Sequence, residues 1–282
     1  MKIRFFANFA DSKKLKTLLE NINECSNTNI TYGNDYTHVV IFNTVMPDIS
    51  HIPKRNVLGF AQEPYPFLNL TPFFIEYAEK YIGKYFIGDK INLPDTFIES
   101  NAYLFFTLPR SLSDKTKRMS MMVSQRKYAP GHKYRHDLVN EILLRNLPID
   151  IYGRGCRFYK GTNSRLKGEF DSRLKGEFDN PLVIFEKYEF TISVENFISK
   201  HYFSKKVIEP LLCNTTPIYL GCSNIDVYFP NQTIRLYGEL QNDIRLITDI
   251  LQNPEKYRKT IDIPLVKSKV NLLNNLNNLY LE

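Results

Sequence analysis

The 282 residues suffice for two domains of ordinary size, and the 43 % hydrophobic and 24 % charged fractions are typical of a globular protein. The net charge of +7 permits binding to phosphates, nucleic acid or an anionic membrane surface, but the basic residues are scattered, which disfavours nucleic-acid binding as the main function. No apolar stretch reaches the length of a transmembrane helix, and residues 1–14 are too weakly apolar for a signal peptide.

The cysteines and histidines give no sign of a metal site. None of the four cysteines pairs with another at metal-ligand spacing, and the five histidines form no cluster. We therefore expect buried thiols in a reducing compartment and no structural zinc.

The first part of the chain alternates between strand-like and helix-like segments, which predicts an α/β domain. Residues 11–22 form an amphipathic pattern, and residues 38–42 (HVVIF) are continuously apolar, as in a strand buried on both faces. Residues 109–118 are polar and charged and are interpreted as the linker to a second domain. Strands are expected at residues 2–7, 38–42, 56–60, 81–87 and 103–106.

An acidic residue follows the predicted strand at 56–60. Glu63 stands before Pro64, within the sequence AQEPYP, and the prolines favour an extended or turning backbone. A lone glutamate in such a loop is usually a solvated surface residue. The alternative is a catalytic base placed just beyond a strand end.

The second domain begins with a strand at residues 119–123, and a polar loop starting at Ser124 leads to a helix over residues 134–146. Arg135 stands in the first turn of that helix, as either a surface residue or an anion-binding group. The next strand ends in Tyr152-Gly153, where glycine allows a tight turn or a close approach to a ligand.

The sequence SRLKGEFD occurs twice in tandem, starting at Ser164 and at Ser172. One such repeat does not make a solenoid. It is interpreted as a duplication in a tolerant surface loop without chemistry.

Residues 188–230 contain the densest pattern of polar groups around a strand–helix–strand unit. Glu195 and Asn196 follow an alternating strand, Ser204 can cap a helix, and Lys205 and Lys206 occupy that helix's first turn. Lysines at a helix N-terminus, beyond the carboxyl end of a strand, favour an anion such as phosphate. A proline within the same helix, Pro210, is expected to kink it.

The remaining segments complete the second domain. Residues 216–220 are expected to form a strand, and residues 240–251 and 264–281 to form helices. The stripe of Val266, Val270, Leu273 and Leu276 in the last helix is typical of a core.

The stretches YEFTISVEN and SKKVIEPLLCNTTPIYLG resemble the C-terminal signature of the α-1,3/1,4-fucosyltransferases, glycosyltransferase family 10. The agreement in spacing and residue type extends over about forty positions. The resemblance implies a GT-B-like fold with two Rossmann-like α/β domains facing a central cleft. Residues 1–112 would bind the acceptor and residues 113–282 the nucleotide sugar, and by analogy with other two-domain glycosyltransferases the last helix is expected to pack back across the first domain.

The resemblance also implies an activity: inverting transfer of L-fucose from GDP-fucose to a hydroxyl of a glycan acceptor. Bacterial and viral members of the family lack the membrane anchor of animal members, so we expect a cytoplasmic enzyme without a transmembrane segment. The positive charge permits peripheral association with a membrane. Fixed cations can take the place of a metal ion at a diphosphate, so no metal and no cofactor are expected.

The matching positions suggest roles for individual residues. Glu63 is the expected base, and Arg135 and Lys206 are the expected diphosphate clamp. Glu195 is either an acceptor for a sugar hydroxyl or a partner that orients Lys206, and Asn196 is expected to bind the fucose or a phosphate. Three further donor-binding candidates share positions near the family's nucleotide loops: Ser124, Tyr152 and Gly153.

One departure from the family pattern bears on specificity. Lys205 stands where the family has a glutamate associated with the ribose. A GT-B enzyme that uses another nucleotide sugar therefore stays open, as does an inactive descendant that only binds glycans. Binding of nucleic acid is the remaining alternative.

Overall fold

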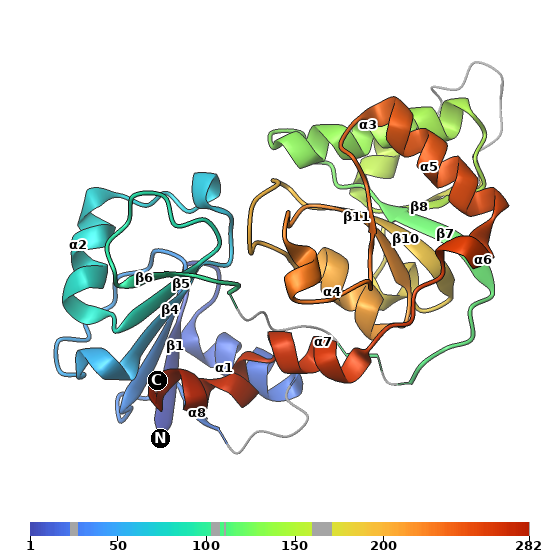
Figure 1. The fold of residues 1–282 in the computed structure, drawn as a ribbon. Helices are drawn as coiled ribbons and strands as arrows, with labels where there is room; N and C mark the ends of the chain where they lie inside the picture. The colour runs from blue at the N-terminus through green and yellow to red at the C-terminus, as the bar shows by residue number, and fades with distance from the viewer. Residues whose placement is uncertain (23–27, 103–107, 110, 160–170, 282) are drawn as a thin grey trace. The chain divides into compact units, whose positions relative to one another are not determined.

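The computed structural model describes residues 1–22, 28–102, 108–109, 111–159 and 171–281 (Figure 1). Its contacts divide the chain into two compact units. The sequence placed the division after residue 112, whereas the structure places it after Phe106 and returns two later segments to the first unit. The first unit comprises Met1–Phe106, Ser199–Tyr202 and Lys267–Glu282, and the second comprises Thr107–Ile198 and Phe203–Val266.

The first unit is built on a parallel six-stranded sheet with the strand order β2-β1-β3-β4-β5-β6. Its strands are β1 (Lys2–Phe6), β2 (Asn29–Thr31), β3 (His38–Phe42), β4 (Val57–Phe60), β5 (Lys84–Ile87) and β6 (Phe97–Glu99). Its helices are α1 (Ser12–Ile22), α2 (Pro72–Tyr81) and α8 (Leu272–Leu281), with short 3-10 turns at Lys54–Asn56 and Tyr65–Phe67.

Helices cover both faces of the first sheet (Figure 1). On one face, Leu15 of α1 and Leu276 of α8 pack in one core with Phe5 and Phe42. On the other face, Phe74 of α2 packs against Tyr85. Burial on both faces explains the continuous apolar runs of β3 and β4, because neither strand has a solvent-exposed side.

The sequence pattern misplaced several boundaries in this unit. Residues 81–87 were expected to form one strand, but Tyr81 ends α2, which begins at Pro72 with its cap at Thr71. A proline at the first helical position and a threonine cap are the local signals for that helix. The strand expected at residues 103–106 lies outside the described residues.

The C-terminal segment forms two helices instead of one. These are α7 (Ile263–Val270) and α8, and the second half of α7 and all of α8 belong to the first unit. The division falls at Asn271, whose side-chain Oδ1 accepts a hydrogen bond from the Asn274 backbone N–H at 3.1 Å. An asparagine cap of this kind starts a new helix.

The second unit also contains a parallel six-stranded sheet, in the order β12-β11-β10-β7-β8-β9. Its strands are β7 (Lys117–Met122), β8 (Asp150–Tyr152), β9 (Leu174–Gly176), β10 (Tyr188–Val194), β11 (Thr216–Leu220) and β12 (Ile234–Arg235). Its helices are α3 (Pro130–Leu144), α4 (Lys205–Leu212), α5 (Leu240–Gln252) and α6 (Pro254–Tyr257), with 3-10 turns at Arg154–Phe158, Pro181–Ile184 and Ile225–Val227.

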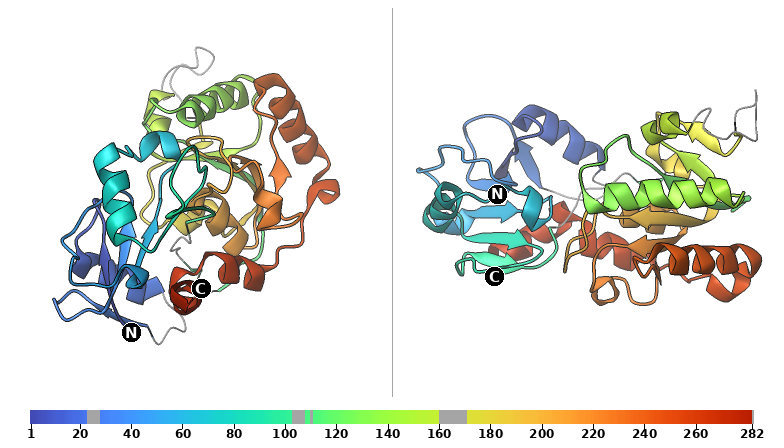
Figure 2. Two further views of the ribbon diagram at one scale, coloured as in Figure 1. Left: turned by 60° about the vertical axis from the view of Figure 1, so that its left-hand side comes forward. Right: turned by 90° about the horizontal axis from the view of Figure 1, so that it is seen from above.

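Helices α3 and α5 lie side by side over one face of this sheet, as the left view of Figure 2 shows. Leu138 of α3 and Ile247 of α5 pack there with Phe190 and Ile218 of the central strands. The three described cysteines are Cys156, Cys213 and Cys222, which are buried and form no disulfide among the described residues. None of the helices in the described part of the chain has the length and apolar character that a bilayer-spanning segment needs.

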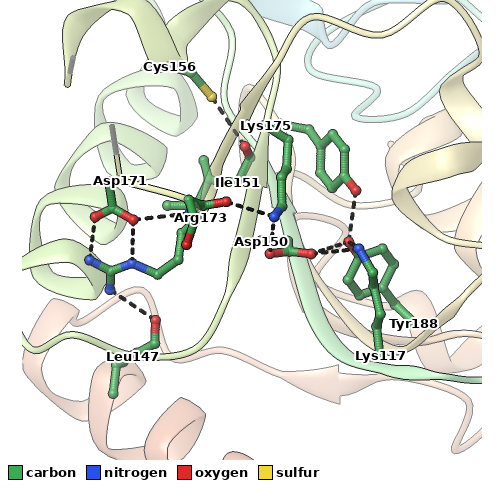
Figure 3. Close-up of polar contacts among 11 residues, drawn as sticks. Lys117, Leu147, Asp150, Ile151, Cys156, Asp171, Arg173, Lys175 and Tyr188 are labelled. Atoms are coloured by element: carbon green, nitrogen blue, oxygen red, sulfur yellow. Dashed lines mark hydrogen bonds and ion pairs between the residues drawn. The ribbon is translucent and has the colours of Figure 1, made fainter. Parts of the chain in front are cut away.

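The second copy of the SRLKGEFD repeat is part of this sheet rather than a loop without a structural role. It supplies the edge strand β9, and Lys175 forms an ion pair with Asp150 at 3.1 Å (Figure 3). Arg173 donates to both carboxylate oxygens of Asp171 and to the Leu147 carbonyl. Asp171 is the last residue of the first copy, and the rest of that copy lies outside the described residues.

Deletion of either copy produces the same shortened chain, in which Asn163 takes the place of Asp171 two residues before the arginine. We expect this chain to fold, because the β9 sequence is retained. We expect it to lose about 1–2 kcal/mol of stability with the half-buried ion pair. Thermal unfolding measures the loss, and Asn163→Asp in the shortened chain should restore it. If that substitution has no effect on the melting temperature, the ion pair does not hold the edge strand.

Candidate functional site

The order of strands in the second sheet locates its ligand-binding edge. Strand β7 comes first in the chain, β8 then pairs on one side of it, and β10 pairs on the other. Ligands of open parallel sheets bind beyond the carboxyl ends of strands at such a reversal of strand order. Here those ends are Met122 of β7 and Val194 of β10.

Arg135 reaches this edge from α3. The helix starts against the end of β10, where the Gly131 N–H donates to the Asn196 carbonyl at 3.0 Å and a Cβ on Gly131 would overlap the Glu195 carbonyl. Arg135 is only 3 % exposed. Its guanidinium donates to the Val194 carbonyl and, at 3.1 Å, to Asn196 Oδ1. These two hydrogen bonds hold Val194 and Asn196 in place against Arg135.

Lys206 reaches the same edge from α4 and is oriented by Glu195. The Glu195 carboxylate is fully buried and accepts hydrogen bonds from Ser204 N at 2.7 Å and Ser204 Oγ at 2.8 Å. It also pairs with Lys206 Nζ at 3.0 Å. Of the two roles considered for Glu195, these contacts are those of a partner that positions Lys206.

Pro210 has a local compensation within α4. The proline lacks the N–H that would bond to the carbonyl four residues earlier, which belongs to Lys206. Ser193 Oγ donates to that carbonyl at 2.7 Å instead. The same hydrogen bond ties the Lys206 backbone to β10.

Two cavities share this edge and have Met122 in common. The smaller, of about 20 Å³, is lined by Arg135 and Lys206 together with the last residues of β10. The larger, of about 380 Å³, is lined by polar, charged and apolar residues. Its lining residues include Ser124, Gln125, Arg126, Gly153, Arg154, Glu177 and Phe178.

Gly153 is required where it stands. Its φ of 103° lies in the left-handed region, and a Cβ at this position would overlap the Val123 carbonyl. Glycine therefore lets the loop after β8 pack directly on the loop after β7, which opens with Ser124. Both residues line the larger cavity.

Two other candidates have different surroundings. The Tyr152 hydroxyl bonds to the Tyr188 hydroxyl at 2.8 Å, and its ring packs against Phe178, so its side chain is turned away from the smaller cavity. Lys205 is half-buried at the first position of α4 and is absent from the lining of both cavities.

Glu63 belongs to the first unit, in the loop beyond the carboxyl end of β4. Its backbone neighbours are fixed: Gln62 N–H donates to Asn43 Oδ1 at 2.9 Å, and Pro64 is buried and opens a 3-10 turn. The Glu63 side chain itself is exposed. A carboxylate held in this way on an ordered backbone can accept a proton from a bound hydroxyl.

Sequence reasoning missed His132, which stands one turn before Arg135. The helix was expected to begin at residue 134, but Pro130 at its first position starts it earlier. His132 is 2 % exposed, and burial together with the nearby Arg135 and Lys206 lowers its pKa to about 4. The imidazole is therefore neutral near pH 7, and the positive charges that line the smaller cavity are those of Arg135 and Lys206, an arrangement suited to an anion.

The model of glycosyltransferase family 10 (fucosyltransferase), C-terminal part, matches residues 112–259, which is more than half of the chain. The chain belongs to glycosyltransferase family 10. The matched part of this family 10 chain contains both cavities and excludes Glu63.

A known protein matches part of the chain in sequence. Alpha-(1,3)-fucosyltransferase B of Drosophila melanogaster is 31 % identical over 116 residues, which cover 40 % of this family 10 chain and 25 % of the fly protein. The chain thus spans about a quarter of that relative.

A crystal structure of an alpha1,3-fucosyltransferase with GDP-fucose aligns with 100 % of the chain and 90 % of its own length, at 13 % identity and a TM-score of 0.57. HepE of Anabaena with UDP covers 98 % of this chain and 91 % of its own, at 11 % identity and a TM-score of 0.58. These likenesses confirm the predicted GT-B fold.

Proposed function

We propose that this protein transfers L-fucose, with inversion, from GDP-fucose to a hydroxyl of a glycan acceptor. The observation that carries the proposal is the pair Arg135 and Lys206, which line one cavity at the switch point of the second sheet. Family membership supports the reaction class, and a cytoplasmic location is part of the same proposal.

The chemistry requires stabilisation of a departing diphosphate. The Arg135 guanidinium is a planar fork suited to two phosphate oxygens, and the Lys206 ammonium is a point charge beside it. Both cations are held by hydrogen bonds to the ends of β10, so little reorganisation is needed when negative charge develops. We propose that these cations fulfil the role that a divalent metal plays in other glycosyltransferases.

The nucleoside is proposed to occupy the larger cavity. Its volume of about 380 Å³ is within the usual range for a ligand pocket. Its charged lining includes Glu177, whose carboxylate can accept hydrogen bonds from the N–H groups of guanine. Because Met122 lines both cavities, a nucleoside in the larger one would place its phosphates toward Arg135 and Lys206.

The test is thermal stabilisation of the purified protein by GDP, UDP, CMP and ADP at equal concentrations. A ligand that binds only the folded state raises the melting temperature. We expect GDP to give the largest increase in melting temperature. In a second experiment, we expect the protein to transfer fucose from GDP-fucose to members of a panel of glycans. Stabilisation by UDP alone, without GDP, would contradict the proposed donor.

A GT-B enzyme that uses another nucleotide sugar is the second candidate, and Lys205 is the residue that favours it. We expect Lys205→Glu, which restores the family residue, to tighten GDP binding by about fivefold, the worth of one hydrogen bond to the ribose. Titration of GDP and UDP measures the effect, and Lys205→Gln controls for the loss of positive charge. Equal profiles in all three proteins would mean that Lys205 does not contact the nucleotide.

A further inference from the structure

His132 has one ring nitrogen in use and one available. The Ala129 backbone N–H donates to His132 Nδ1 at 3.2 Å, which closes the first turn of α3. Because Nδ1 accepts, the proton of the neutral imidazole must be on Nε2. No residue in the described part of the chain receives a hydrogen bond from this Nε2–H, although His132 as a whole is only 2 % exposed.

His136 stands one turn later on the same helix and is the opposite case. Its Nε2–H donates to the Ser124 carbonyl at 3.0 Å, and its Nδ1 contacts the Tyr159 hydroxyl. Both nitrogens are therefore occupied within the protein. Two buried histidines on one helix thus differ in whether a hydrogen-bond donor is left for a ligand.

Positive groups surround His132. They are Arg135 of α3, Arg126 of the loop before α3 and Lys206 of α4, whereas burial lowers the pKa of the nearby His136 and leaves it uncharged near pH 7. The exposed ring of Tyr128 stands edge-on to His132, with 4.7 Å between the ring centroids. The Glu195 carboxylate at this edge is turned to Ser204 and Lys206. A second proton on His132 is unfavourable in this setting until a negative charge enters.

We propose that His132 binds the diphosphate of the sugar-nucleotide donor through Nε2–H and takes up a proton onto Nδ1 as the complex forms. This inference rests on the proposed function. Two effects lower the pKa of His132 in the free protein: its burial and the repulsion from Arg135 and Lys206. The two negative charges of the diphosphate offset both effects. The pKa of His132, about 4 in the free protein, therefore rises on binding. The capping hydrogen bond to Nδ1 is given up, and the resulting imidazolium is a third cation facing the leaving group.

The sign of the pH effect follows from linkage. A group whose pKa is higher in the complex than in the free protein binds a proton with the ligand, so affinity increases as the pH falls. Between about pH 8 and about pH 6 we expect GDP-fucose to bind threefold or more tightly to the wild type. GDP-fucose is the suitable probe because its diphosphate is esterified at both ends and does not titrate in this interval.

Two substitutions separate the functions of the two nitrogens. His132→Asn keeps an acceptor at the position of Nδ1 and removes the Nε2 donor. His132→Gln places an amide N–H at the position of Nε2 and does not titrate. The control is His136→Gln, which alters the other buried histidine of α3.

Calorimetric titration with GDP-fucose, in buffers of different ionisation enthalpy, measures affinity and proton uptake together. At about pH 8 we expect His132→Gln to bind like the wild type and His132→Asn to bind about threefold to tenfold more weakly. At about pH 6, only the wild type and His136→Gln should take up a proton.

The outcomes distinguish the two proposals. Failure of the wild type to bind GDP-fucose would overturn the proposed function. Binding by the wild type without proton uptake, with unchanged affinity in His132→Asn, would overturn the role of His132 and leave the proposed function intact. Proton uptake that is lost in His136→Gln but kept in His132→Asn would also overturn it.

Discussion

Glu63→Gln is expected to lower turnover by about a hundredfold or more while donor affinity barely changes. Glutamine keeps the shape of the side chain but cannot accept the proton of the acceptor hydroxyl. The backbone around Glu63 should be unaffected, because the hydrogen bond of Gln62 to Asn43 and the buried Pro64 do not involve the carboxylate. Donor affinity should hold because the nucleotide-binding candidates all belong to the other unit.

Steady-state kinetics with saturating acceptor and a nucleotide titration together measure this effect. Glu79→Gln is the matched control, since Glu79 is an exposed glutamate on α2 of the same unit. Turnover at the native rate in Glu63→Gln would remove Glu63 from the mechanism. A comparable loss in the control would mean that the assay reports general destabilisation of the unit.

Arg135→Ala and Lys206→Ala are each expected to weaken GDP binding by about 1.5–3 kcal/mol, the worth of a charge-assisted hydrogen bond. This corresponds to roughly a tenfold to 150-fold higher Kd. Arg135→Lys should give an intermediate loss, because lysine keeps the charge but not the bidentate fork. Calorimetric or fluorescence titration of the purified variants checks all three.

The control for net charge is Lys133→Ala, which removes an exposed cation of α3 that is absent from the lining of both cavities. Melting temperatures must accompany the titrations, because the buried Arg135 also holds Val194 and Asn196 and its loss can loosen the end of β10. Native GDP affinity in both alanine variants, with intact folding, would show that the nucleotide binds elsewhere.

Much of the second unit could be predicted from local sequence. The alternation in residues 188–194 and the apolar run at 216–220 correspond to β10 and β11, and Ser204 does cap α4, accepting from Lys206 N at 3.3 Å. These features depend on side chains a few residues apart, so the chain encodes them locally. The resemblance to the family, rather than a local pattern, predicted Arg135 and Lys206 at the phosphates, and both residues line the smaller cavity.

Other features depend on segments that are distant in sequence. Nothing local shows that Ser193 would supply the hydrogen bond displaced by Pro210, or that Tyr152 would turn its hydroxyl to Tyr188. Both contacts exist because parallel strands pair only after a crossover, which brings together residues that share no local pattern. The C-terminal helix α8 likewise belongs to the core of the first sheet, which the analogy with other glycosyltransferases suggested but no local pattern shows.

The two copies of SRLKGEFD show most directly the difference between what local sequence determines and what tertiary structure determines. The copies are identical in sequence, so local propensity cannot choose between them. The second copy forms β9, where its Arg173 pairs with Asp171, whereas the corresponding position before the first copy is Asn163.

The sequence alone determined that a strand–helix–strand unit would present Lys206 beyond β10. Tertiary structure shows how Arg135 reaches the same edge: the packing of α3 against the end of β10 brings its side chain to the smaller cavity, with His132 one turn earlier on the same helix.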